Sequence, residues 1–160
     1  MPITPSPLTP LGQWICDVCG QIIEDPDHGY VQFNTDANGK YNDFIIVHHA
    51  THSPLRDTGG DCYKYRLDTD LPSYLGAEGI ARLLSKIDLG HHIEPDFQGA
   101  NTSNLRAWVD FFRRLHTPYY EEARLYWAKA REDGFFAGAN EVWPYLPDIL
   151  EDLINRYRED

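Results

Sequence analysis

Apolar residues in the first half of the chain form short runs that are typical of β-strands. Residues 30–35 and 41–47 combine β-branched and aromatic side chains. Between these runs stands Asn38-Gly39, a dipeptide that favours a tight hairpin turn. A third strand is expected over residues 62–67, after a loop at 53–61 that holds Pro54, Gly59 and Gly60. The first half is therefore predicted to be a small β-rich unit.

The second half changes to the three- and four-residue spacing of amphipathic helices. We expect four of them. The first holds Ile80, Leu83, Leu84 and Ile87 and ends at Gly90, and the second starts near residues 101–103 and holds Leu105, Trp108, Val109 and Phe112. The third runs from Thr117-Pro118 to about residue 132, and the fourth follows Pro147. Thr117 would cap the third helix and Pro118 would be its first helical residue. Together they predict a small helical bundle packed against the β unit.

The 160 residues and the 42% apolar content suit one ordinary domain or two small ones. We predict an α+β fold, with a zinc-bound β module of a hairpin plus a third strand, followed by four helices. The expected parts are a flexible proline-rich arm at 1–12, the β module at 13–70 and the helical domain at 71–160. The arm lacks the basic and apolar segments of a signal peptide, and no apolar run is long enough to cross a bilayer.

Candidate metal ligands lie in the first half. Cys16 and Cys19 form a C-x-x-C pair, and a histidine cluster at 48–52 and then Cys62 follow. Two residues between cysteines let one turn direct both thiolates at one ion, and a closed structural zinc site needs four such N and S ligands. We predict one structural Zn²⁺ held by Cys16, Cys19, His48 and Cys62.

The identity of the histidine ligand stays open between neighbouring residues. His48 directly continues the predicted strand and is preferred, with His49 as the alternative fourth ligand. His52 and His28 are further candidates. Both faces of the strand are apolar, so strand alternation does not decide between His48 and His49. Residues 14–67 resemble zinc-ribbon and treble-clef zinc fingers, in which a C-x-x-C knuckle is joined to a β-hairpin. Those families commonly present a second close pair, whereas His48 and Cys62 are far apart in this sequence.

A second constellation, at residues 91–116, resembles the HNH nuclease motif. The resemblance implies that His92 activates water, that Asn104 orients it and that His116 helps to bind a divalent metal. The chemistry would be metal-assisted phosphodiester hydrolysis. The motif usually has an acidic residue before its first histidine, where this chain has His91. The alternative interpretation is a loop at 91–103 that joins two helices.

Net charge bears on the class of partner. The chain carries a net charge of −11, and both halves are acidic. Proteins that bind nucleic acids usually present a basic surface, because phosphate contacts dominate their affinity. The local basic cluster of Arg106, Arg113 and Arg114 is expected to be a solvated helix face. Charge therefore disfavours a nucleic-acid partner and favours another protein.

The preferred functional prediction is a non-enzymatic, zinc-stabilised interaction or regulatory module in the cytoplasm, where cysteines stay reduced. An HNH-like nuclease that uses His92, Asn104 and His116 is the first alternative. A zinc-finger regulator that binds nucleic acid is the second. Aromatic residues crowd the second half and could form a core or a partner-binding groove, and residues 135–140 are the expected exposed apolar loop.

Overall fold

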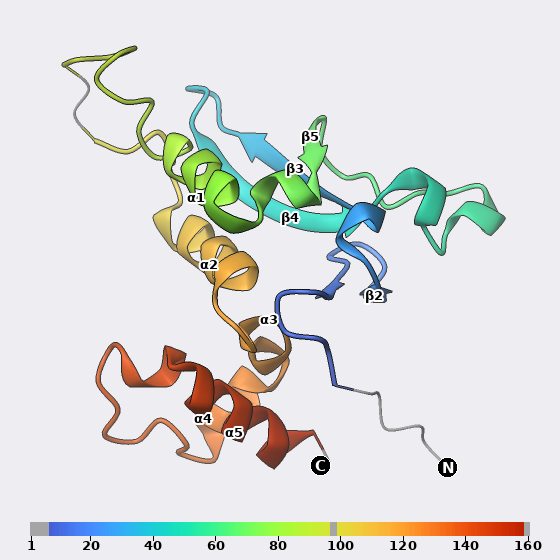
Figure 1. Ribbon diagram of the computed structural model, residues 1–160, viewed down its shortest axis with the longest axis vertical. Coiled ribbons are helices and arrows are strands. Elements are labelled where there is room, and N and C mark those ends of the chain that lie inside the picture. Colours follow the sequence, from blue (N-terminus) through green and yellow to red (C-terminus); the bar gives the residue numbers. More distant parts are fainter. Residues whose placement is uncertain (1–6, 97–98, 159–160) are drawn as a thin grey trace.

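The computed structural model describes residues 7–96 and 99–158 (Figure 1). Two small antiparallel sheets and a set of helices form it, which confirms the predicted α+β class. Residues 1–6 of the expected flexible arm lie outside the described part. Leu8 is already buried, and its N–H donates to Glu122 Oε2 at 2.7 Å, so this part of the arm is attached to the helices.

The larger sheet has the strand order β4-β3-β5. β3 (Gly29–Thr35) and β4 (Tyr41–His48) form the predicted hairpin, with Gly29 opposite His48 and Thr35 opposite Tyr41. Gly39 takes a φ of 76° in the turn, a left-handed conformation that glycine adopts without a Cβ penalty. The smaller sheet pairs β1 (Trp14–Ile15) with β2 (Ile22–Ile23), and sequence analysis did not anticipate it.

The third strand is β5 (Leu67–Asp70), so the prediction of a strand at 62–67 was wrong. The reason lies in the buried side chain of Gln32 on β3. Its Oε1 accepts hydrogen bonds from Lys64 N at 2.9 Å and from Tyr65 N at 3.1 Å. These bonds occupy the backbone donors that a strand would use, and pairing with β3 starts only at Leu67 opposite Phe33. Cys62 is therefore free to lie in a loop.

Helices α1 (Gly76–Ser85) and α2 (Leu105–His116) lie beside the sheet (Figure 1). Phe111 of α2 stacks on Phe44 of β4, with ring centroids 5.2 Å apart. Trp108 Nε1 donates to Leu83 O at 2.9 Å and joins the two helices. A first hydrophobic cluster runs from Trp14 through the strands to Leu115, and the boundary expected at residue 70 falls inside it.

The predicted third helix is divided into three pieces, which corrects the expectation of one helix from Thr117 to residue 132. They are α3 (Tyr120–Ala123), a 3₁₀ turn (Arg124–Tyr126) and α4 (Trp127–Glu132). Tyr119, and not Thr117, precedes α3, and its φ of 67° turns the chain away from the direction of α2. Through these pieces α3 packs against β1 and against α5 (Pro147–Tyr157), and α4 also packs against α5.

A second hydrophobic cluster joins α3, α4 and α5 in the part of Figure 1 farthest from the larger sheet. Leu150, Leu153 and Ile154 of α5 are buried in it, as the helical spacing predicted. The apolar loop expected to be exposed at 135–140 contributes Phe135 and Phe136, which pack partly into this cluster. In the described ranges, each helix is too short or too polar to traverse a bilayer.

Candidate metal centre

Four side chains from three parts of the chain meet at the predicted metal site. One potential ligand atom from each of Cys16, Cys19, His48 and Cys62 lies within 4.8 Å of the others, so the group could hold a metal ion. No other group of His, Cys, Asp or Glu in residues 7–96 and 99–158 has this spacing. The sequence therefore predicted which residues come together, and it preferred the histidine that the structure places among the thiols.

The C-x-x-C pair sits in the turn between β1 and β2. Gly20 N donates to Cys16 O at 2.9 Å, and Cys16 N donates to Gln21 O at 2.9 Å. Gly20 has a φ of 75°, a conformation that favours glycine. These bonds close a tight knuckle that points the two thiols in one direction.

His48 reaches the knuckle because the knuckle is hydrogen-bonded to β4. Asp17 N donates to Ile46 O at 2.8 Å, and Ile46 N donates to Asp17 Oδ2 at 2.7 Å. His48 lies two residues further along the same strand, so its side chain falls beside the cysteines. Its Nδ1 is 3.4 Å from Cys19 Sγ and 3.9 Å from Cys62 Sγ. The end of β4 thus supplies the third candidate ligand.

The other nitrogen of His48 fixes the orientation of the ring. Its Nε2 lies 3.2 Å from Ile22 O, so a proton on Nε2 would be donated to this carbonyl and Nδ1 would be left with a lone pair. Burial lowers the pKa of His48, which favours the neutral ring that a metal ligand must have.

Cys62 completes the group from a loop. It is fully buried, and the Ser53 hydroxyl lies 3.0 Å from its sulfur. Burial raises the pKa of Cys62 to about 12, against a lowering by the Ser53 hydrogen bond. Burial also raises the pKa of Cys19. The pocket therefore disfavours bare thiolates, and a bound cation would reverse that preference.

The alternative histidine ligands have other contacts. His49 Nδ1 accepts from Thr51 N at 3.2 Å, and its ring lies 4.4 Å from that of Tyr30. His28 and His52 stack on each other with ring centroids 3.8 Å apart. These three side chains lie outside the group of four.

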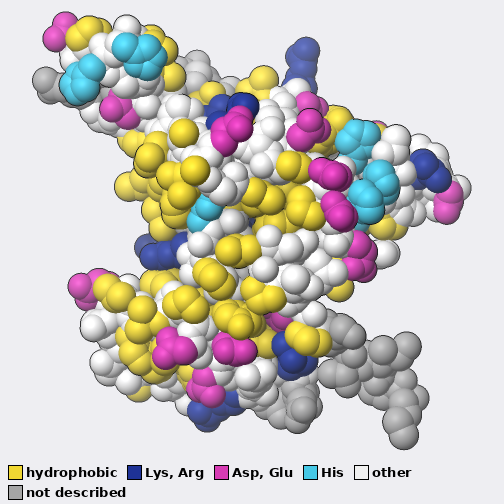
Figure 2. All heavy atoms as spheres, viewed as in Figure 1, with side chains coloured by type: hydrophobic (Ala, Val, Ile, Leu, Met, Phe, Trp, Pro, Cys, Tyr) yellow, Lys and Arg dark blue, Asp and Glu magenta, His cyan; other side chains and the backbone are white. Residues whose placement is uncertain are grey.

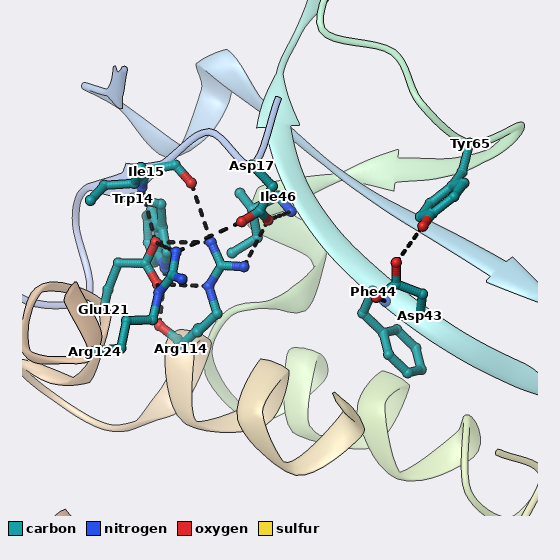
Figure 3. Close-up of polar contacts among 10 residues, drawn as sticks. All are labelled: Trp14, Ile15, Asp17, Asp43, Phe44, Ile46, Tyr65, Arg114, Glu121 and Arg124. Carbon is teal, nitrogen blue, oxygen red and sulfur yellow. Dashed lines mark hydrogen bonds and ion pairs between the residues drawn. The ribbon is translucent and has the colours of Figure 1, made fainter. Parts of the chain in front are cut away.

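Behind the knuckle lies a network of ion pairs that sequence analysis missed (Figure 3). Arg114 was expected on a solvated face but is only 4% exposed. Its Nη1 lies 2.7 Å from Asp17 Oδ2, its Nε lies 2.7 Å from Glu121 Oε2, and its Nη2 donates to Ile15 O at 3.2 Å. Arg124 also binds Glu121, with 3.0 Å between Nε and Oε2. Asp17, inside the C-x-x-C pair, is thus connected to α2 and α3.

Opposite charges overcome the effect of burial within this network. Burial alone would lower the pKa of Arg114, but Glu121 and then Asp17 raise it above its ordinary value. Burial alone would raise the pKa of Glu121, yet the charge and hydrogen bonds of Arg114, followed by those of Arg124, hold it below its usual range. A sequence signal did exist, because Arg114 lies on α2 between the apolar positions Phe111 and Leu115.

The residues of the HNH resemblance do not meet. Asn104 precedes α2, and its Oδ1 accepts from Ala107 N at 3.1 Å as a helix cap. His116 is the last residue of α2, about 18 Å from Asn104 at 1.5 Å per residue, with its ring 4.9 Å from that of Phe112. His92 is exposed on the loop after α1. Two of the three side chains are thus separated by a whole helix.

Comparisons with known proteins give no family for this fold or site. The chain matches no protein-family model, no curated protein and no solved structure. Function must therefore be argued from the chemistry of the site.

Proposed function

We propose that this protein is a non-enzymatic, zinc-stabilised module that acts through contact with another protein. The observation that carries the proposal is the close approach of three thiols and one imidazole, all from the protein. A tetrahedral ion with four protein ligands has no open position for water or substrate, so its role is structural.

The donor set fits zinc in both chemistry and spacing. Zinc in proteins binds thiolate at about 2.3 Å and imidazole nitrogen at about 2.0 Å, which places tetrahedral ligand atoms about 3.5–3.8 Å apart. The distances of 3.4 Å and 3.9 Å from His48 Nδ1 to the two sulfur atoms are close to this spacing. Bound zinc would supply the positive charge that the buried thiols need and would tie β1, β4 and the Cys62 loop together. Free cysteines in such a group suit a reducing cytosol.

An interaction role is supported by the surface of the helical part. Leu105, Leu125 and Val142 are each more than half exposed. Leu105 lines a groove that also holds Trp127 and Tyr145, and such aromatic side chains are frequent anchors where proteins meet. The nuclease alternative has weaker support, because Asn104 and His116 lie at opposite ends of α2.

The first test is the metal content of the purified protein, measured by mass spectrometry of the element and by the visible spectrum of a cobalt-substituted sample. We expect one equivalent of zinc, and a cobalt spectrum typical of a tetrahedral thiolate site. Cys62→Ala should lose tight binding and unfold the N-terminal half, while His49→Ala should keep its zinc. One tightly held equivalent in Cys62→Ala would contradict the assignment.

The second test addresses catalysis. Zinc-loaded wild type and His92→Ala are incubated with supercoiled plasmid and Mg²⁺ or Mn²⁺, and nicking is followed on a gel. We expect no difference between the two proteins and no accumulation of nicked plasmid. Nicking by the wild type that disappears in His92→Ala would identify a nuclease and would overturn the non-enzymatic proposal.

A further inference from the structure

A groove of about 880 Å³ lies between α2 and the segments that hold Arg124, Trp127 and Tyr145. Figure 2 shows the molecule hollowed on its left side, between the part that holds α2 and the part that holds α4 and α5. The groove is wide open to solvent, and both polar and apolar side chains line it. Its shape therefore suits a segment of chain laid along it more than a small enclosed molecule.

One wall of the groove is basic. Arg106 and Arg113 lie two turns apart on α2, on the same side of the helix and opposite its buried face, about 10 Å from each other along its axis. Neither has a carboxylate oxygen at ion-pair distance in the part of the chain that the structure describes. Two guanidinium groups without an acidic partner are therefore available on an otherwise acidic protein.

The other wall is aromatic and holds one of these arginines in place. Trp127 and Tyr145 stack with ring centroids 5.6 Å apart and an interplanar angle of 18°. The Arg113 guanidinium lies over the Tyr145 ring, with its central carbon 3.4 Å from the centroid. A stacked guanidinium keeps its N–H edges free, so it can still donate two parallel hydrogen bonds to a carboxylate. The aromatic pair beside it offers an apolar surface.

The residues between the two arginines favour a peptide over a nucleic acid. Asp110 lies between Arg106 and Arg113 on the groove face and accepts a 2.5 Å hydrogen bond from the Tyr120 hydroxyl. A fixed carboxylate at the centre of the face would repel a continuous row of phosphates. Two available arginines also give few of the phosphate contacts from which nucleic-acid affinity arises. The third arginine of the groove, Arg124, is already paired with Glu121.

The spacing of the arginines indicates how the acidic groups would be arranged. In an extended polyproline II segment, residues three apart point to the same side and are separated by about 9 Å. This is close to the separation of about 10 Å between Arg106 and Arg113 along α2. The side chains between the two acidic residues would then face the Trp127 and Tyr145 rings.

We propose that this groove binds an extended acidic segment of a partner protein, with two carboxylates three residues apart on Arg106 and Arg113 and an apolar side chain on Trp127 and Tyr145. The proposal rests on the proposed interaction function and names the chemical class of the partner.

The test uses the full-length, zinc-loaded protein and a panel of fluorescein-labelled peptides read by fluorescence polarisation. Each peptide holds Glu-Pro-x-Glu in a proline-rich frame, with x varied among apolar residues, and has a twin in which both glutamates are glutamine. We expect glutamate peptides to bind at least about tenfold more tightly than their twins, which equals about 1.4 kcal/mol. Added salt should weaken this binding.

Variants assign the binding to the groove. Arg106→Gln and Arg113→Gln should each weaken the best glutamate peptide by about tenfold. Arg66→Gln, which changes the net charge equally on an exposed loop before β5, should leave it unchanged. Zinc content and urea unfolding curves that match the wild type would show that each variant is folded.

Each contrary outcome has a distinct meaning. Equal binding of glutamate and glutamine peptides, lost in Trp127→Ala, would refute an acidic partner and leave an interaction module. Displacement of the peptide by single-stranded oligothymidine at lower concentration than by unlabelled peptide would assign the groove to nucleic acid. Absence of binding by the whole panel would refute the groove proposal, while the proposed function would still be judged by metal content and plasmid nicking.

Discussion

Replacement of Arg114 by methionine tests whether the buried ion pairs between the knuckle and the helices stabilise the fold. Methionine keeps much of the length of the side chain but donates no hydrogen bond. Removal of one member of a buried ion pair costs about 3–5 kcal/mol, because the other charge stays buried without its partner. Glu121 keeps Arg124 at 3.0 Å, so we take the lower end, about 3 kcal/mol. For a chain of this size that corresponds to a fall in Tm of about 6–12 °C.

Urea unfolding of the zinc-loaded protein, followed by tryptophan fluorescence, measures the difference. Arg106→Met on the exposed face of the same helix is the matched control, and it should change stability by less than about 0.5 kcal/mol. If the free energy of unfolding of Arg114→Met were within about 0.5 kcal/mol of that of this control, the ion-pair network would contribute no more to stability than an exposed charge does. The reasoning would then fail.

Acid should weaken the same interaction in a defined direction. The pKa of Glu121 is lowered in the folded protein, so its charge stabilises the fold above the ordinary glutamate pKa of about 4.3. This stabilisation is lost as the pH falls through the lowered pKa. The difference in stability between the wild type and Glu121→Gln should therefore narrow below about pH 4.3. A difference that stays constant down to pH 2 would contradict the lowered pKa.

Three further predictions concern the metal site and one close contact. His48→Ala should abolish tight zinc binding while His49→Ala should not, as read by competition with a chromophoric chelator; the reverse result would move the ligand to His49. Zinc affinity should rise with pH, by up to about 100-fold per unit from Cys19 and Cys62 alone, because both raised pKa values require the thiols to release protons on binding. A pH-independent affinity between pH 6 and 8 would exclude these thiols as ligands. Gly79→Ala should destabilise the fold by more than about 3 kcal/mol, since its Cβ would lie 2.0 Å from backbone atoms of Tyr74; unchanged thermal unfolding would show that α1 can shift.

The grouping of Cys16, Cys19, His48 and Cys62 could be predicted because much of its chemistry is local in the sequence. A C-x-x-C pair restricts two thiols to one turn, and a strand that ends in histidine limits the choice to neighbouring residues. The hairpin was equally accessible, since Asn38-Gly39 marks its turn. The hairpin turn and the C-x-x-C pair each lie within a few consecutive residues, whereas Cys62 comes from a separate loop.

The missed features depend on contacts between distant residues. The start of the third strand at Leu67 is set by the Gln32 side chain, which binds backbone donors more than thirty residues away. The start of α3 at Tyr120, instead of at Thr117, follows from Tyr119, whose left-handed backbone nothing in its residue type indicates. Arg114 was misplaced because a charged residue is expected in solvent unless its partners are known, and Asp17 is 97 positions distant.

The sequence separation within that network also sets an order of events during synthesis on the ribosome. Ile15 N donates to Glu121 Oε1, which lies 106 residues later in the chain, and the ion pair of Asp17 with Arg114 can form only after α2 has been made. At a synthesis rate of about 5–20 residues per second, these partners are made about 5–20 s after the knuckle. In roughly the second half of that interval, after Cys62 has been made, the three cysteines and His48 could already hold an ion, whereas the Asp17 carboxylate has no arginine. Metal binding could therefore precede formation of the ion pairs around the knuckle. The zinc available during synthesis would then decide whether the nascent chain binds the ion before its helices pack against the knuckle.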